Sequence, residues 1–246
     1  MRWFLMFKSK ARFANRVVAA IVLFELCLIV AYWIDILIGE PEPLHRLVNL
    51  DGEANIPAWF SSSQLLFGCL VAWVTGLLRG SRDRPSRLFL FMTGSCFILM
   101  SVDETAQLHE GITGVIGTRY VDWLPTFLLT HKGVIALLLI AALAVLRFIW
   151  RDLKAIWQWS RRESLLALAG MCVFLLGAAG VETLGFKFLQ LGSLVYKIEV
   201  TIEEFMEMFG ASLIVYAALS FTQDQLERNG VMRFGRKPTS RLTKAA

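Results

Sequence analysis

Carboxylates gather near the ends of two apolar stretches, at spacings that could bind a cation or exchange protons. The residues concerned are Asp103, Glu104, His109 and Glu110 in one stretch, and Glu199, Glu203, Glu204 and Glu207 in the other. In an α-helix, positions three, four or seven apart share a face, so Asp103 and Glu110 lie on one face and Glu203 and Glu207 on another. Ionised carboxylates at such spacings repel each other. Bound cations, shared protons or nearby lysines must therefore neutralise these faces.

Carboxylate oxygens with a little imidazole are typical ligands of divalent metal ions. We therefore predict a site for iron, manganese or zinc, although the paired Glu-x-x-His motif of di-iron and di-manganese bundles is not present. The predicted ligands are Asp103, Glu104, His109, Glu110, His131, Glu182, Glu203 and Glu207. The alternative is that these acids lie among lipid headgroups, where they are solvated or paired with Lys132, Lys187 and Lys197. No residue is assigned a catalytic role.

The elements that would position these residues are six apolar runs, each close to the roughly 20 residues that a membrane-spanning helix needs. Of the 246 residues 56% are hydrophobic and only 18% are charged, and the mean hydropathy is +0.58. The composition predicts an all-α, polytopic membrane helix bundle that forms a single transmembrane domain over 1–246. The predicted helices cover 15–39, 58–78, 88–112, 133–150, 164–188 and 196–222, followed by a basic tail at 223–246.

The lysines and arginines of the loops predict how this bundle is oriented. In the alternation of six helices, 20 of the 25 basic residues fall on the side that holds both termini. Because cytoplasmic loops are enriched in Lys and Arg, both termini are expected in the cytoplasm, and a bacterial cytoplasmic membrane is expected. We interpret the net charge of +5 as a topology signal with lipid contacts, and we expect no nucleic-acid partner.

The helical rise places the carboxylates in the outer half of the membrane. Asp103 lies about 22 Å and Glu207 about 21 Å from the cytoplasmic boundary, and Glu203 and Glu182 lie about 27 Å from it. Glu25 is different, because it falls in the middle of the first run. It is expected to be protonated and hydrogen-bonded to a Ser or Thr of a neighbouring helix, or else to belong to a proton path.

Two further expectations concern the outer loop and helix packing. His45 lies in the outer loop between the first two runs and is expected to be exposed. The small residues at 177–180 (Gly-Ala-Ala-Gly) are expected to allow close approach of another helix.

Two motifs carry a resemblance to a known kind of protein. They are Asp103-Glu104-x4-His109-Glu110 and Glu203-Glu204-x2-Glu207-x2-Gly210. This pair resembles a set of uncharacterised bacterial multi-pass membrane proteins in which a D-E-x4-H-E helix end precedes an E-E-x2-E-x2-G helix. The resemblance covers about half of the chain. The resemblance supports a polar site in a membrane bundle and implies no particular reaction.

Three functions fit these features. The first is a metal-binding membrane protein, in which the ion would activate water, oxygen or a lipid headgroup. The second is a proton- or cation-coupled transporter, because intramembrane carboxylates are common relay groups. The third is an accessory subunit of a larger membrane complex, with other membrane subunits as partners in addition to the lipid bilayer.

Overall fold

The structure, a computed structural model, describes residues 12–52, 54–80, 83–106, 131–181 and 192–228, with the backbone alone at 12, 131–143, 179–181 and 228. Every regular element in these ranges is helical, which confirms the all-α class. The elements are α2 (Arg12–Leu37), α3 (Leu44–Val48), α4 (Ile56–Leu77), α5 (Arg87–Ala106), α7 (His131–Trp159), α8 (Arg161–Leu175), the π-helical turn η2 (Leu176–Val181) and α10 (Leu194–Arg228).

Four of the described helices are long and apolar enough to cross a membrane. They cover Phe13–Leu37, Ile56–Leu77, Arg87–Ala106 and Leu194–Glu227, and they correspond to the first, second, third and sixth predicted runs. These four apolar helices indicate a membrane protein. The fourth and fifth runs fall on α7 and on α8 with η2, where the side chains of 131–143 and all of 182–188 lie outside the described part. The count of six spans and the orientation stay predictions.

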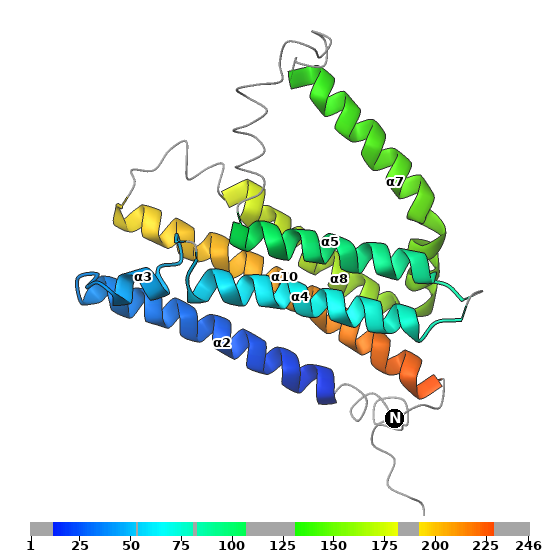
Figure 1. Ribbon diagram of the computed structural model, residues 1–246, viewed down its shortest axis with the longest axis horizontal. Coiled ribbons are helices and arrows are strands. Elements are labelled where there is room, and N and C mark those ends of the chain that lie inside the picture. Colours follow the sequence, from blue (N-terminus) through cyan, green and yellow to red (C-terminus); the bar gives the residue numbers. More distant parts are fainter. Residues whose placement is uncertain (1–11, 53, 81–82, 107–130, 182–191, 229–246) are drawn as a thin grey trace, which may run out of the picture.

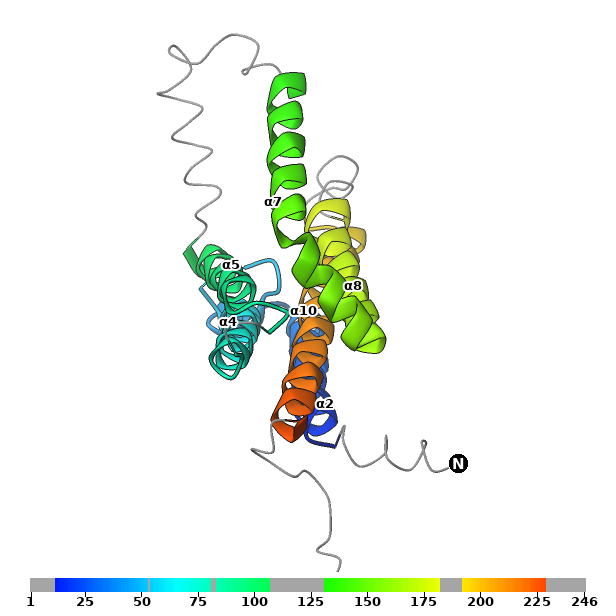
Figure 2. The same ribbon diagram turned by 90° about the vertical axis from the view of Figure 1, so that its right-hand side faces the viewer.

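Helix α10 is the element on which the others assemble. It contacts α2, α4, α8 and η2, while α5 packs mainly against α4. Figures 1 and 2 show α2, α4, α5, α8 and α10 running beside one another, whereas α7 leans away from the bundle and meets α8 at its C-terminal end. Polar groups on the faces of α2, α4 and α8 that lie against α10 can therefore find partners on this helix.

The apolar side chains of α2 separate into a lipid side and a bundle side. Leu23, Val30 and Leu37 are exposed, as expected for side chains that face lipid. The buried face instead carries Glu25, Leu28, Tyr32 and Asp35, which recur at helical spacing. The first helix thus turns two carboxyl groups away from lipid and toward other helices.

Glycines bring α8 and α10 into backbone contact. A Cβ atom added to Gly210 would lie 2.6 Å from the Phe174 nitrogen and 2.7 Å from the Gly170 oxygen. Further along, a Cβ at Gly177 would lie 3.0 Å from the Glu203 oxygen. The close approach predicted for the small residues at 177–180 is confirmed at Gly177.

We predict that Gly210→Ala destabilises the protein by about 1–3 kcal/mol, because the new methyl group meets backbone that cannot move aside cheaply. Gly68→Ala is the matched control, since its Cβ would lie 3.6 Å from the Phe97 ring, an ordinary contact. The control should be neutral or slightly stabilising, because alanine favours a helix more than glycine does. Thermal unfolding in detergent, followed by circular dichroism, measures both. Equal midpoints for the two variants would contradict the packing described for α8 and α10.

Candidate functional site

A group of carboxylates surrounds Glu204 on α10. The acids that act electrostatically on Glu204 are, from the strongest, Glu207, Glu104, Glu203 and Asp51. We call these five residues the outer carboxylate cluster. They come from α10, from the end of α5 and from the loop before α4. Glu104 of the third run thus interacts electrostatically with Glu204 of the sixth run, and the predicted set of metal ligands stays a prediction.

The loop that carries Asp51 is fastened to two helices. Asn55 caps α4 by accepting a hydrogen bond from the Ala58 nitrogen at 3.0 Å, and its side-chain nitrogen donates to the backbone oxygens of Asn49 (2.6 Å) and Gly52 (2.7 Å). The Tyr196 hydroxyl of α10 donates to Asp51 Oδ1 at 2.9 Å. Asp51 is thus held beside α10 by a hydrogen-bonded loop and by the Tyr196 hydroxyl.

The α5 side of the cluster is fixed one turn before Glu104. Ser62 of α4 donates to the Ser101 backbone oxygen at 2.8 Å, and Ser101 donates to the Ser62 backbone oxygen at 2.9 Å. These reciprocal bonds join α4 to α5 just below the point where α5 reaches the cluster.

The π-helical turn η2 approaches the cluster from α8. A Cβ at Gly177 would lie 3.0 Å from Glu207 Cγ and 3.1 Å from Met206 Cβ, so η2 lies directly on the acidic turn of α10. Single π-helical turns inside helices are often found at functional sites. The departure from α-helical winding therefore coincides with the candidate site.

The predicted ligands are described only in part. Glu104, Glu203 and Glu207 belong to the outer carboxylate cluster, and Asp103 is half-buried on α5. His109, Glu110 and Glu182 lie outside the described residues, and of His131 only the backbone, at the start of α7, is described. Within the described chain, no three His, Cys, Asp or Glu side chains are arranged to hold a metal ion. The metal site therefore stays a prediction.

The predicted ligand set leaves out two members of the cluster, Asp51 and Glu204. Asp51 lies in a loop whose path cannot be deduced from periodicity. Glu204 lies one position away from Glu203, so helical spacing does not place it on the face that Glu203 and Glu207 share. The adjacency of Glu204 to Glu203 in the sequence was the one feature that could have indicated its membership of the cluster.

A second polar site lies in the middle of the bundle, where α2, α4 and α10 meet. Glu25 Oε1 accepts hydrogen bonds from Gln64 Nε2 at 2.7 Å and from the Ser212 hydroxyl at 2.6 Å. Glu25 and Ser212 are fully buried and Gln64 nearly so. The expected hydrogen bond between Glu25 and a serine of a neighbouring helix is confirmed, with the Ser212 hydroxyl as the donor. Gln64 was missed, although a glutamine within an apolar run was a signal for it.

The expectation that His45 is simply exposed is wrong. His45 Nδ1 lies 2.7 Å from Oδ2 of the fully buried Asp35, and its side chain is only 28% exposed. The reason is that the loop forms α3, which folds the chain back over the end of α2. The same loop is tied to α10 by an ion pair between Glu40 and Lys197.

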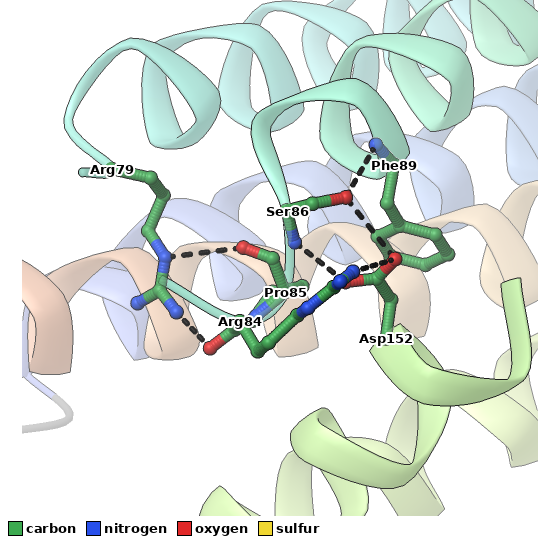
Figure 3. A network of polar contacts seen from close by, with 6 residues as sticks. All are labelled: Arg79, Arg84, Pro85, Ser86, Phe89 and Asp152. Carbon is green, nitrogen blue, oxygen red and sulfur yellow. Dashed lines mark hydrogen bonds and ion pairs between the residues drawn. The ribbon is translucent and has the colours of Figure 1, made fainter. Parts of the chain in front are cut away.

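A third network joins the loop between α4 and α5 to α7 (Figure 3). It lies at the opposite end of α4 from Asp51. Asp152 accepts hydrogen bonds from Arg84 Nη1 (3.0 and 3.1 Å), from the Ser86 nitrogen (2.6 Å) and from the Ser86 hydroxyl (3.1 Å). Ser86 Oγ accepts from the Phe89 nitrogen at 3.2 Å, at the start of α5. Since every oxygen of Asp152 is occupied, we interpret this network as structural.

Comparison with known protein families identifies one family that matches most of the chain. A family model described as Domain of unknown function (DUF8692) matches residues 5–221. The chain belongs to this family. No curated protein and no solved structure matches it. The expectation of an uncharacterised family is confirmed, whereas the bacterial origin and the two motifs stay predictions for this DUF8692 member.

We predict that the Glu40–Lys197 pair stabilises the fold in a pH-dependent way. The hydrogen bond from Lys197 lowers the pKa of Glu40 below its ordinary value of 4.5. The stabilisation is therefore fully present above about pH 4.5 and is lost as the pH falls through the lowered pKa. The effect should be small and reduced by salt, because the pair is partly exposed.

Thermal unfolding midpoints measured from pH 6 to pH 3 test this pair. Lys197→Met should flatten the acid side of the profile, and Lys197→Arg, which keeps the charge, should retain the wild-type shape. Identical profiles for wild type and Lys197→Met would show that the pair does not contribute.

Proposed function

We propose that this protein spans a bacterial cytoplasmic membrane six times, with both termini in the cytoplasm, and binds a divalent cation at a site that joins the outer carboxylate cluster to predicted ligands outside the described side chains, namely His109, Glu110, His131 and Glu182. The distribution of lysines and arginines along the sequence supports the orientation. The partners in this proposal are the lipid bilayer and other membrane subunits that the basic tail at 223–246 would contact.

The observation that carries the proposal is the convergence of carboxylates from three segments on Glu204. Asp51, Glu104, Glu203 and Glu207 all act on it electrostatically. Carboxylates that repel one another in a partly buried place need compensating positive charge from bound cations, shared protons or nearby lysines. A divalent cation supplies that charge at one point and uses carboxylate oxygens as ligands.

The surroundings suit a metal ion better than a loose headgroup contact. The cluster is bounded by α5, by α10, by the π-helical turn η2 and by a loop that Asn55 and Tyr196 fasten. A binding site holds its ligand more precisely when its side chains lie on helices or strands than when they lie on loops. Iron, manganese or zinc remains our choice of ion, because the sequence also offers His109 and His131 as imidazole ligands.

The chemistry open to such a site follows from its place near the outer surface. A bound divalent ion would polarise water or a lipid headgroup oxygen and stabilise developing negative charge. The carboxylates themselves would orient the ion and accept protons. We assign no catalytic residue and no substrate.

The proposal predicts stoichiometric metal in detergent-purified protein, measured by mass spectrometry. The double variant Glu203→Gln/Glu207→Gln should lose this metal, because it removes two anionic ligands while preserving side-chain size. Glu163→Gln, at the start of α8, is the matched control and should retain the metal. Metal-free wild-type protein whose thermal midpoint does not respond to added iron, manganese or zinc would refute the proposal.

A further inference from the structure

The polar site formed by Glu25, Gln64 and Ser212 lies at the centre of a membrane-spanning helix. Glu25 is 12 residues from the start and 12 from the end of the span Phe13–Leu37, or about 18 Å from each. Its side chain is 0% exposed, and those of Gln64 and Ser212 are 3% and 0% exposed. Bulk water therefore does not reach this carboxyl group.

Two acceptor atoms of the site have no hydrogen-bond partner within the described chain. They are Glu25 Oε2 and Gln64 Oε1, and both are buried. A buried acceptor without a donor costs free energy, on the order of 1–3 kcal/mol. Two such atoms in one small network call for a common explanation.

The donor hydrogens of the site are all in use. Gln64 Nε2 donates to Glu25 Oε1 at 2.7 Å and to Ser212 Oγ at 3.1 Å, which accounts for both hydrogens of the amide. The Ser212 hydroxyl donates to Glu25 Oε1 at 2.6 Å, which accounts for its only hydrogen. Glu25 Oε2 and Gln64 Oε1 remain as two acceptors on two side chains that are already hydrogen-bonded to each other. One additional proton supplies the donor that this arrangement lacks.

We propose that Glu25 binds a proton on Oε2 and donates it to Gln64 Oε1, which makes a neutral carboxylic acid–amide pair in the middle of the membrane. The O–H bond on Glu25 forms as an O–H bond of hydronium breaks and releases a water molecule, and no other bond changes. The pair then has two hydrogen bonds in opposite directions between the same two groups. Ser212 completes it by donating to the acid's carbonyl oxygen.

The electrostatic surroundings favour the neutral acid. Helices α4 and α10 meet α2 at this point. The hydrogen-bond partners that they give Glu25 are the uncharged side chains of Gln64 and Ser212. The nearest acid on α10, Glu207, lies five residues from Ser212, or about 7.5 Å along the helix. An ionised carboxylate without a cationic partner is strongly disfavoured in hydrocarbon.

This proton site is separate from the cation proposed for the outer carboxylate cluster. Ser212 lies eight residues beyond Glu204, about 12 Å further into the membrane. The fully buried Met208 lies between them. Failure of one proposal would leave the other intact.

The proton also links the charge of Glu25 to helix packing. α2 rests on α10, and Glu25 lies on the buried face of α2. Loss of the proton would leave an uncompensated charge in this contact and loosen α2. Stability contributed by the protonated form is present at low pH and is lost as the pH rises.

Infrared spectroscopy of the full-length protein in lipid vesicles tests the inference. The wild type at neutral pH should show the C=O stretch of a protonated carboxylic acid that Glu25→Gln removes and the control Glu163→Gln does not. Gln64→Leu should shift this band in the direction expected for a weaker hydrogen bond. No difference between wild type and Glu25→Gln in the acid C=O region would overturn the proposal.

Thermal unfolding provides a second test that does not depend on the infrared assignment. Wild-type protein should lose stability as the pH rises into the alkaline range, whereas Glu25→Gln, which is permanently neutral, should lose less. Stabilisation of the wild type by sodium ions at neutral pH, abolished in Glu25→Gln, would show that the site holds a metal cation in place of the proton. That result would also overturn the proposal.

Discussion

Polar side chains inside a membrane bundle can persist only where another helix supplies their partners, and α10 supplies them at three levels. Near its start it meets α5 and the loop before α4 through the outer carboxylate cluster. At its middle, Ser212 meets Glu25 and Gln64. Toward its end, Thr222 lies 2.5 Å from Thr75 of α4, and Gln225 is hydrogen-bonded to Arg79. Glycines that let α8 touch the α10 backbone complete the packing around this helix.

The negative charge of the two sites is compensated in different ways because their surroundings differ. The outer carboxylate cluster brings several acids from separate segments together beside a fastened loop, so excess negative charge must be balanced there. The central site contains one carboxyl among uncharged donors, fully removed from water, and the neutral acid satisfies its hydrogen bonds. A cation suits the first arrangement and a proton suits the second, and neither site requires the other.

Helical periodicity and hydropathy were sufficient to predict the all-α class, four of the apolar spans and a serine partner for Glu25. These features depend on spacing within one helix. Asp51, Gln64 and the His45–Asp35 contact depend on how a loop folds back or how a helix is rotated in the bundle. The spacing of residues along one sequence does not predict the path of a loop or the rotation of a helix. Glu204 shows the same limit, because a shift of one residue turns a side chain by about 100°.

Calorimetric titration of metal-stripped protein with Mn²⁺ would test the central claim, that the outer carboxylate cluster is a cation site, most directly. The account predicts saturable binding to the wild type, unchanged binding to Glu163→Gln, and at least roughly tenfold weaker binding to Glu204→Gln, equivalent to about 1.4 kcal/mol. Glu204→Gln is the decisive variant because it replaces the carboxylate on which the others converge. Equal binding by the wild type and Glu204→Gln, or no saturable binding by either, would contradict the account.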